Sequence, residues 1–137
     1  MQTGSVIIRR KTPTIKNGSK SVFDTSAFAR LVRDVSPVLI AIEKVHAMPK
    51  QGVVSTFTFG ENYGVLKGIA AALYIPLVEY RPQEWQSEFF RGMNKELGKQ
   101  RSVVYCSALF PQEVNLTDGE CDAILIALHA RKQFKPP

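Results

Sequence analysis

Three acidic side chains stand where carboxylates often carry out chemistry. Glu43 comes directly after the apolar run 38–42, and ligands in open α/β sheets gather at the carboxyl ends of strands. Asp118 and Asp122 are four residues apart, so on a helix they project from one face. Oxygen ligands suit Mg²⁺, and two such ions can clamp the attacking and leaving oxygens of a phosphodiester. These three residues are our candidate catalytic and metal-binding set.

Each of these carboxylates also has an ordinary structural interpretation. Glu43 is equally the solvated end of a strand. Acids in the first turn of a helix cap it and complement its dipole. Capping accounts well for Asp118 and adequately for Glu120, but Asp122 lies one turn further along. Asp122 therefore favours the metal-site interpretation most.

Positive charge is concentrated near the beginning of the chain. The sequence holds 18 Lys and Arg against 12 Asp and Glu, a net charge of +6, and residues 1–23 contain basic side chains but no acid. A basic arm on a nearly neutral body predicts a polyanionic partner such as DNA. The alternative is a solvated hairpin whose charges only aid solubility. The residues that we expect to contact phosphate are Arg9, Arg10, Lys11, Lys50, Lys99 and Arg131.

The composition excludes several classes of protein. A length of 137 residues with 45% hydrophobic content predicts one folded domain over 1–137. Two cysteines without CxxC spacing exclude a disulfide scaffold or zinc finger as the organising principle. We expect His46 to be a loop residue and His129 a helix-surface residue. With no membrane-length apolar run and no signal peptide, we expect a cytoplasmic protein of a bacterium or a phage-infected cell.

Hydrophobic periodicity predicts alternating strands and helices. Short strands are expected at Val6–Ile8 and around an Asn17-Gly18 turn. An amphipathic helix follows, for which Asp24, Thr25 and Ser26 offer caps and which Pro37 ends. Residues 38–42 are apolar on both faces, as in a strand covered from both sides. Beyond them we expect a helix at 55–73, a strand at 75–80 and helices opening at Pro82 and spanning 95–109 and 118–132. The order indicates an α/β fold with a mixed β-sheet flanked by α-helices.

The predicted helix 55–73 carries a ridge without side chains. Gly60, Gly64 and Gly68 recur every four residues, and glycine costs about 1 kcal/mol relative to alanine in a helix interior. Three such positions suggest a close backbone approach, most simply to the sheet, and otherwise to a partner subunit or to DNA.

Residues 38–130 resemble the RuvC-type Holliday-junction resolvases, above all their phage-encoded and organellar branch. The shared landmarks are IAIEKVHAMP at 40–49, QGV at 51–53, FG at 59–60, YG at 63–64, YRPQEW at 80–85, LFP at 109–111 and DGECDA at 118–123. The resemblance implies a ribonuclease-H-like fold, a homodimer and cleavage of four-way DNA junctions with two Mg²⁺ ions per site, or Mn²⁺ as a substitute.

The same resemblance assigns roles to individual residues. Glu43 matches the second acidic ligand of the family and Asp122 its last, while Asp118 falls where this branch often carries a His or Asp ligand. Phe57 and Phe59 fall where related enzymes place aromatic or polar side chains at the junction centre, which predicts that both contact DNA.

The beginning of the chain departs from the family pattern. The family starts with a strand that ends in Asp-Pro-Gly, whose Asp is the first metal ligand, whereas residues 2–8 look like the stretch after that turn. No acid precedes Asp24, and both Asp24 and Asp34 flank a helix expected to lie away from the site. We also expect residues 4–9, or a second subunit, to cover the edge of strand 38–42.

Because the first acidic ligand is missing, we expect the chain to bind four-way junctions but to cleave them poorly, even with Mn²⁺. Two alternatives stay open. One is a catalytically weak or inactive relative that recognises branched DNA without cutting it. The other is a different nuclease of the same fold that acts on an RNA–DNA hybrid or on another branched substrate.

Overall fold

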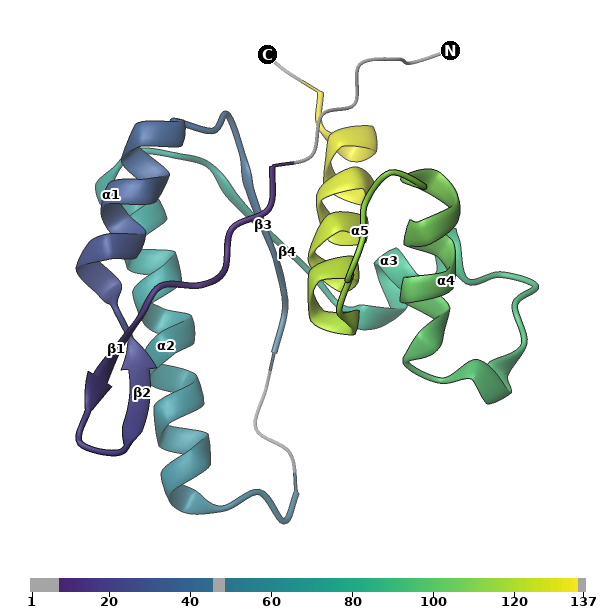
Figure 1. Ribbon diagram of the computed structural model, residues 1–137. Coiled ribbons are helices and arrows are strands. Elements are labelled where there is room, and N and C mark those ends of the chain that lie inside the picture. The colour runs from purple at the N-terminus through teal and green to yellow at the C-terminus, as the bar shows by residue number, and fades with distance from the viewer. Residues whose placement is uncertain (1–7, 46–48, 136–137) are drawn as a thin grey trace.

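The computed structural model describes residues 8–45 and 49–135 (Figure 1). Val6, Ile7 and His46, for which the sequence predicts a strand and a loop, lie outside the described residues. The elements are β1 (Thr14–Asn17), β2 (Lys20–Phe23), α1 (Thr25–Val35), β3 (Ile40–Glu43), α2 (Val53–Ala72), β4 (Leu77–Tyr80), α3 (Pro82–Phe89), the 3₁₀ turn η1 (Lys95–Leu97), α4 (Gln100–Leu109) and α5 (Asp118–Gln133).

The first elements form as the sequence predicts. Strands β1 and β2 pair antiparallel, with Asn17 opposite Lys20, and Gly18 supplies the positive φ of +66° that the tight turn needs. The Asp24 carboxylate accepts a hydrogen bond from the Ala27 backbone N–H at 3.0 Å, so among the three candidate caps it is Asp24 that caps α1. The helix ends with Ser36 in the left-handed conformation, directly before Pro37.

The described strands make two small sheets. The first is the antiparallel β1–β2 hairpin, and the second is a parallel pair in which β3 lies beside β4. In this register Ile40 faces Leu77 and Glu43 faces Tyr80. Parallel and antiparallel pairing therefore both occur, as the α/β prediction requires, but in separate sheets. The register places Glu43 at the carboxyl end of β3.

The hydrophobic core lies on one side of the β3–β4 pair. Figure 1 shows α1 and α2 on one side of these strands and α3, α4 and α5 on the other. On the second side a continuous cluster is buried, composed of Trp85, Phe89, Phe90, Cys106, Phe110, Cys121, Ile124, Leu125 and Ile126. On α1 and α2 the buried side chains are Val32 and Ala70. The packing that positions α5 is therefore much denser than the packing around α2.

Strand β3 is less covered than its composition predicts. All four of its residues are only half-buried, and Val38 just before it is 76% exposed. Helices lie on both sides of β3 (Figure 1), but they cover residues 38–42 only in part. Within the described residues β3 also has a strand neighbour on one edge only. The expected cover by residues 4–9 lies mostly outside the described residues.

Helix α2 begins at Val53, two residues earlier than predicted, and its glycine ridge faces open space. Gly60, Gly64 and Gly68 are exposed, and a Cβ added at any of them would meet no atom of the described residues within 4 Å beyond its own helix. The expected approach of this ridge to the sheet is therefore wrong. The other two approaches that the sequence suggests, to a partner subunit or to DNA, stay predictions.

The later helices differ from the prediction mainly at their starts. Residues 95–97 form the separate turn η1, because Gly98 adopts a φ of +55° and interrupts the helix, so α4 begins at Gln100. Cys106 and Cys121 are buried free thiols between α4 and α5. Within the described residues, no helix is both long and apolar enough to cross a membrane.

The open glycine ridge makes a prediction about stability. Replacing Gly60, Gly64 and Gly68 together by alanine should raise the free energy of unfolding by about 2 kcal/mol, because each change reduces backbone freedom without a clash. Urea unfolding of the protein alone measures this. Gly92→Ala is the matched control: its φ of +83° disfavours a side chain, so it should destabilise by about 1 kcal/mol. Destabilisation by the triple variant would show that something packs on the ridge.

Candidate functional site

The carboxylate of Glu43 is held by a buried tryptophan. Trp85 lies on α3 and is fully buried in the core. Its indole Nε1–H donates a hydrogen bond to Glu43 Oε2 at 2.9 Å. A buried indole N–H needs an acceptor, and Glu43 is that acceptor. The hydrogen bond therefore directs the strand-end carboxylate towards the side of the strands where α5 packs.

Asp122 is electrostatically coupled to the other two candidate carboxylates. Burial raises its pKa above the ordinary value, and the charges of Glu43 and Asp118 raise it further. A hydrogen bond from Ser102 and the charge of Lys99 act in the opposite direction. The charges of Glu43 on β3 and Asp118 on α5 thus act on Asp122, and a bound cation would relieve that repulsion.

The first turn of α5 is capped differently from the prediction. Thr117 is the N-cap: its hydroxyl accepts from the Glu120 N–H at 3.2 Å, and Glu120 Oε2 accepts from the Thr117 N–H at 3.1 Å. This reciprocal pair is a capping box. Asp118 is exposed in the turn that follows, where its charge complements the helix dipole. Asp118 Oδ1 also accepts from the Gly119 backbone N–H at 3.0 Å, so of the two aspartates only Asp122 takes no part in the contacts of the first turn.

The donor chemistry fits a hard divalent cation, because carboxylate oxygens are the ligands that Mg²⁺ and Mn²⁺ prefer. Yet no three His, Cys, Asp or Glu side chains in the described part of the chain stand close enough together to hold one ion. The electrostatic coupling agrees with a shared site. The convergence of Glu43, Asp118 and Asp122 on one metal stays a prediction.

The residues predicted to contact DNA occupy different surroundings. Phe57 and Phe59 on α2 are 72% and 47% exposed. Lys99 lies beside the coupled carboxylates, since its charge acts on Asp122. Arg9 differs from the others, because its guanidinium pairs with carboxylates of Glu113 and Glu120. The remaining predicted contacts are exposed: Arg10, Lys11, Lys50 and Arg131.

The sequence analysis did not identify Trp85 and Ser102, which contact the candidate carboxylates, and it predicted the wrong environment for His129 further along α5. The signal for Trp85 was that it is the only tryptophan of the sequence. No signal in the sequence pointed to Ser102, because packing decides which group a buried polar atom contacts. His129 is buried rather than on the helix surface. Its Nδ1 contacts Glu88 Oε1, and Tyr80 packs edge-on against its ring. The prediction of a surface histidine is therefore wrong, because α5 buries this face against α3 and β4.

Comparison with known proteins supports the fold. No protein-family model and no curated protein sequence matches this chain. Among solved structures, Thermus thermophilus RuvC superimposes with a TM-score of 0.60 at 13% identity, over 87% of this chain and 82% of that one. The chain has a RuvC-like, ribonuclease-H-like fold. The structure described as T. thermophilus RuvC in complex with a Holliday junction substrate also matches with a TM-score of 0.60, at 15% identity.

That second match covers 78% of this chain but only 62% of the junction-bound RuvC chain. At such low identity the comparison establishes the RuvC-like fold alone. Within that fold, the coupled carboxylates lie on the elements that the sequence singled out, β3 and α5.

The Trp85–Glu43 hydrogen bond predicts a measurable coupling. Trp85→Phe keeps an aromatic ring but removes the N–H, and Glu43→Gln removes the charge that strengthens the bond. Urea unfolding of both single variants, the double variant and the wild type gives the pairwise energy, which should be about 1–2 kcal/mol. Strictly additive losses would show that the bond does not hold Glu43.

The raised pKa of Asp122 predicts how stability depends on pH. Because the folded pKa lies above the ordinary 3.8, ionisation of Asp122 costs stability. This cost is absent below pH 3.8, grows as the pH rises towards the folded pKa and is complete above it. Asp122→Asn should therefore raise Tm by about 2–5 °C at pH 7 without divalent metal, with the gain vanishing near pH 3. Asp34→Asn, at an exposed aspartate on α1, is the control and should change Tm little. A lower Tm for Asp122→Asn at pH 7 would contradict the coupling.

Proposed function

We propose that this chain is a nuclease that acts on branched DNA, with the four-way (Holliday) junction as substrate. One observation carries the proposal: in a RuvC-like fold, the charges of Glu43 and Asp118 act on the half-buried carboxyl of Asp122. Mutual repulsion of this kind is characteristic of sites that bind cations. The match to RuvC in complex with a Holliday junction substrate supports the choice of a junction over other DNA.

Different residues of the site bind the metal, orient a ligand and bind the phosphate. Glu43, Asp118 and Asp122 hold Mg²⁺, or Mn²⁺ as a substitute, with two ions per site. Such ions supply an activated water and stabilise charge on the phosphate. Trp85 keeps the Glu43 carboxylate oriented through its 2.9 Å hydrogen bond. Lys99, whose charge already reaches Asp122, binds the phosphate on the rim of the site.

The exposed face of α2 contributes to recognition. Phe57 and Phe59 offer aromatic rings to solvent and can stack on bases unpaired at the junction centre. Val53 and Val54 are also exposed at the start of this helix, and the glycine ridge follows. We propose that α2 meets DNA and that the chain acts as a homodimer, whose two-fold symmetry gives one site to each of two opposed strands. Phosphate contacts come from Arg10, Lys11, Lys50, Lys99 and Arg131.

One observation favours a second candidate function. The described residues contain no assembled group of three metal ligands, and two-metal hydrolysis needs enough anionic ligands to hold both ions against their repulsion. Phosphate contacts elsewhere do not depend on that group. The second candidate is therefore a protein that binds branched DNA and cleaves it poorly or not at all.

A junction assay tests both candidates. Binding is measured with Ca²⁺ against competitor duplex and RNA–DNA hybrid, and nicking with Mg²⁺ and with Mn²⁺. We expect junction binding at least tenfold tighter than duplex binding, and slow nicking. Glu43→Gln and Asp122→Asn should lower that nicking by a further factor of about ten or more, as expected when the support of a metal site is lost.

Each other outcome selects a different conclusion. Tight binding without nicking in either metal establishes the second candidate. Preference for the hybrid indicates a different nuclease of the same fold. Rapid nicking that Glu43→Gln abolishes would overturn the expectation of poor cleavage, while nicking that survives both substitutions would refute the proposed site.

A further inference from the structure

Arg9 joins residues 8–13, the described part of the N-terminal arm before β1, to the segment 113–120 that leads into α5. Its Nη1 donates to Glu120 Oε2 at 3.0 Å, and its Nη2 donates to the Val114 carbonyl at 3.1 Å. The same Nη2 lies 3.2 Å from Glu113 Oε2. All three charged side chains are about a quarter exposed. A planar guanidinium suits such a multiple contact, because its donors form a fixed fork.

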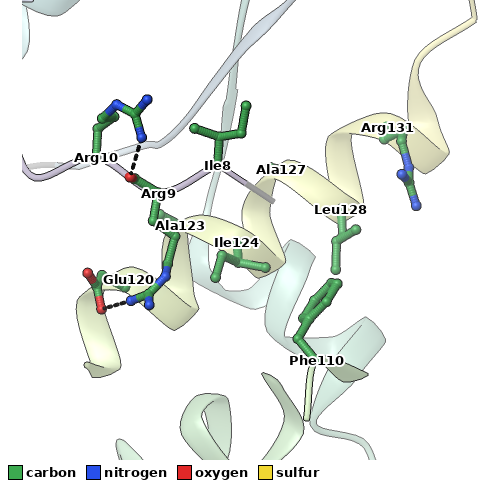
Figure 2. Close-up of a pocket in the computed structure, with 10 residues that line it drawn as sticks. All are labelled: Ile8, Arg9, Arg10, Phe110, Glu120, Ala123, Ile124, Ala127, Leu128 and Arg131. Carbon is green, nitrogen blue, oxygen red and sulfur yellow. Dashed lines mark hydrogen bonds and ion pairs between the residues drawn. The ribbon is translucent and has the colours of Figure 1, made fainter. Parts of the chain in front are cut away.

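The carboxylate that Arg9 holds also fixes the start of α5. Glu120 Oε2 accepts hydrogen bonds from both Arg9 Nη1 and the backbone N–H of Thr117. Asp118 lies in this first turn, and Asp122 one turn later. Figure 2 shows Arg9 reaching from the arm to Glu120 across the beginning of α5. The arm is therefore tied directly to the helical turn that carries two of the three candidate ligands.

The neighbouring arginine provides a contrast within the same segment. Arg10 is exposed and its Nη1 donates to the Arg9 carbonyl at 3.1 Å. Among the described residues it forms an ion pair with no carboxylate. Two adjacent arginines thus carry the same charge in different surroundings: that of Arg9 is balanced by two acids, and that of Arg10 faces solvent.

We infer that Arg9 is a positioning residue of the candidate site and not a phosphate contact. It fastens the segment 113–120 to the arm and thereby fixes where Asp118 and Asp122 stand relative to Glu43. The inference about the metal ligands rests on the proposed function, whereas the fastening of the segment does not. It replaces the role in DNA binding that the sequence predicts for Arg9 and leaves that role to Arg10 and Lys11.

The fastening is tested first without metal or DNA, by amide hydrogen exchange in the wild type, Arg9→Gln and Arg10→Gln. Arg9→Gln should speed exchange at residues 113–122 by about threefold to tenfold relative to the amides of α3, because local opening no longer has to break the Arg9 contacts. Arg10→Gln should leave this ratio unchanged. Equal ratios in all three proteins would overturn the inference.

The positioning role is tested by calorimetric titration with Mn²⁺ alone and by junction binding at several salt concentrations. Arg9→Gln should raise the half-saturating Mn²⁺ concentration severalfold and leave the salt dependence unchanged. Arg10→Gln should leave Mn²⁺ binding unchanged and flatten the log–log salt slope by about 0.9. Arg9→Lys keeps the charge but not the fork, so it should fall between the wild type and Arg9→Gln in Mn²⁺ binding.

The outcomes distinguish the fastening of segment 113–120 by Arg9 from the proposed metal site. A flattened salt slope with unchanged Mn²⁺ binding in Arg9→Gln would make Arg9 a phosphate contact and overturn the inference. A wild type that binds no Mn²⁺ would refute the proposed metal site, while the exchange ratios still decide whether Arg9 fastens the segment. If Arg9→Gln does not fold, Glu113→Gln removes one acid of the contact without touching the capping box and should change exchange and Mn²⁺ binding in the same direction. No change in either would count against the inference.

Discussion

A fully buried indole must give its N–H to an acceptor, and in this protein the acceptor is the carboxylate of Glu43. That single requirement joins the core to the candidate site. Trp85 is placed by its packing among the aromatic residues of α3 and α4, including an edge-to-face contact with Phe90. Because the indole cannot turn without opening the core, the direction of the strand-end carboxylate is set by packing rather than by solvent.

The start of α5 is fixed by polar contacts. Thr117 and Glu120 cap one another, and Arg9 binds the same Glu120 carboxylate from the N-terminal arm. Further along, burial of Leu125 and Cys121 fixes which face of the helix meets the core. With that face fixed, Asp118 and Asp122 have little freedom to avoid the charge of Glu43. Burial, with the charges of Glu43 and Asp118 added to it, raises the pKa of Asp122.

The two sides of the β3–β4 pair serve different purposes. The side of α3, α4 and α5 buries a continuous apolar cluster and carries the coupled carboxylates. On the other side, α2 leaves aromatic rings and a glycine ridge exposed. Exposed aromatic side chains on a thinly packed helix favour contact with another molecule. The coupled carboxylates and the open helix thus lie on opposite sides of the β3–β4 pair.

The sequence by itself determined most of the local structure, because caps, turns and periodicity act over a few residues. A cap for α1 among Asp24, Thr25 and Ser26, the Asn17-Gly18 turn and the α-helices of the described residues all follow from such signals. The placement of Glu43 at a strand end and of Asp118 and Asp122 on one helix was equally readable. The RuvC-like fold, first indicated by resemblance, is supported by the structural comparisons.

Only the tertiary structure decided which side chains meet. Nothing local to Trp85 shows that its N–H reaches Glu43, since 42 residues separate them along the chain. The burial of His129 against Glu88 and the pairing of Arg9 with Glu113 and Glu120 were also invisible. The open glycine ridge was predicted wrongly for the same reason. Periodicity shows which face of a helix carries the repeated apolar or glycine residues. Which neighbour covers that face depends on the packing of segments distant in the sequence.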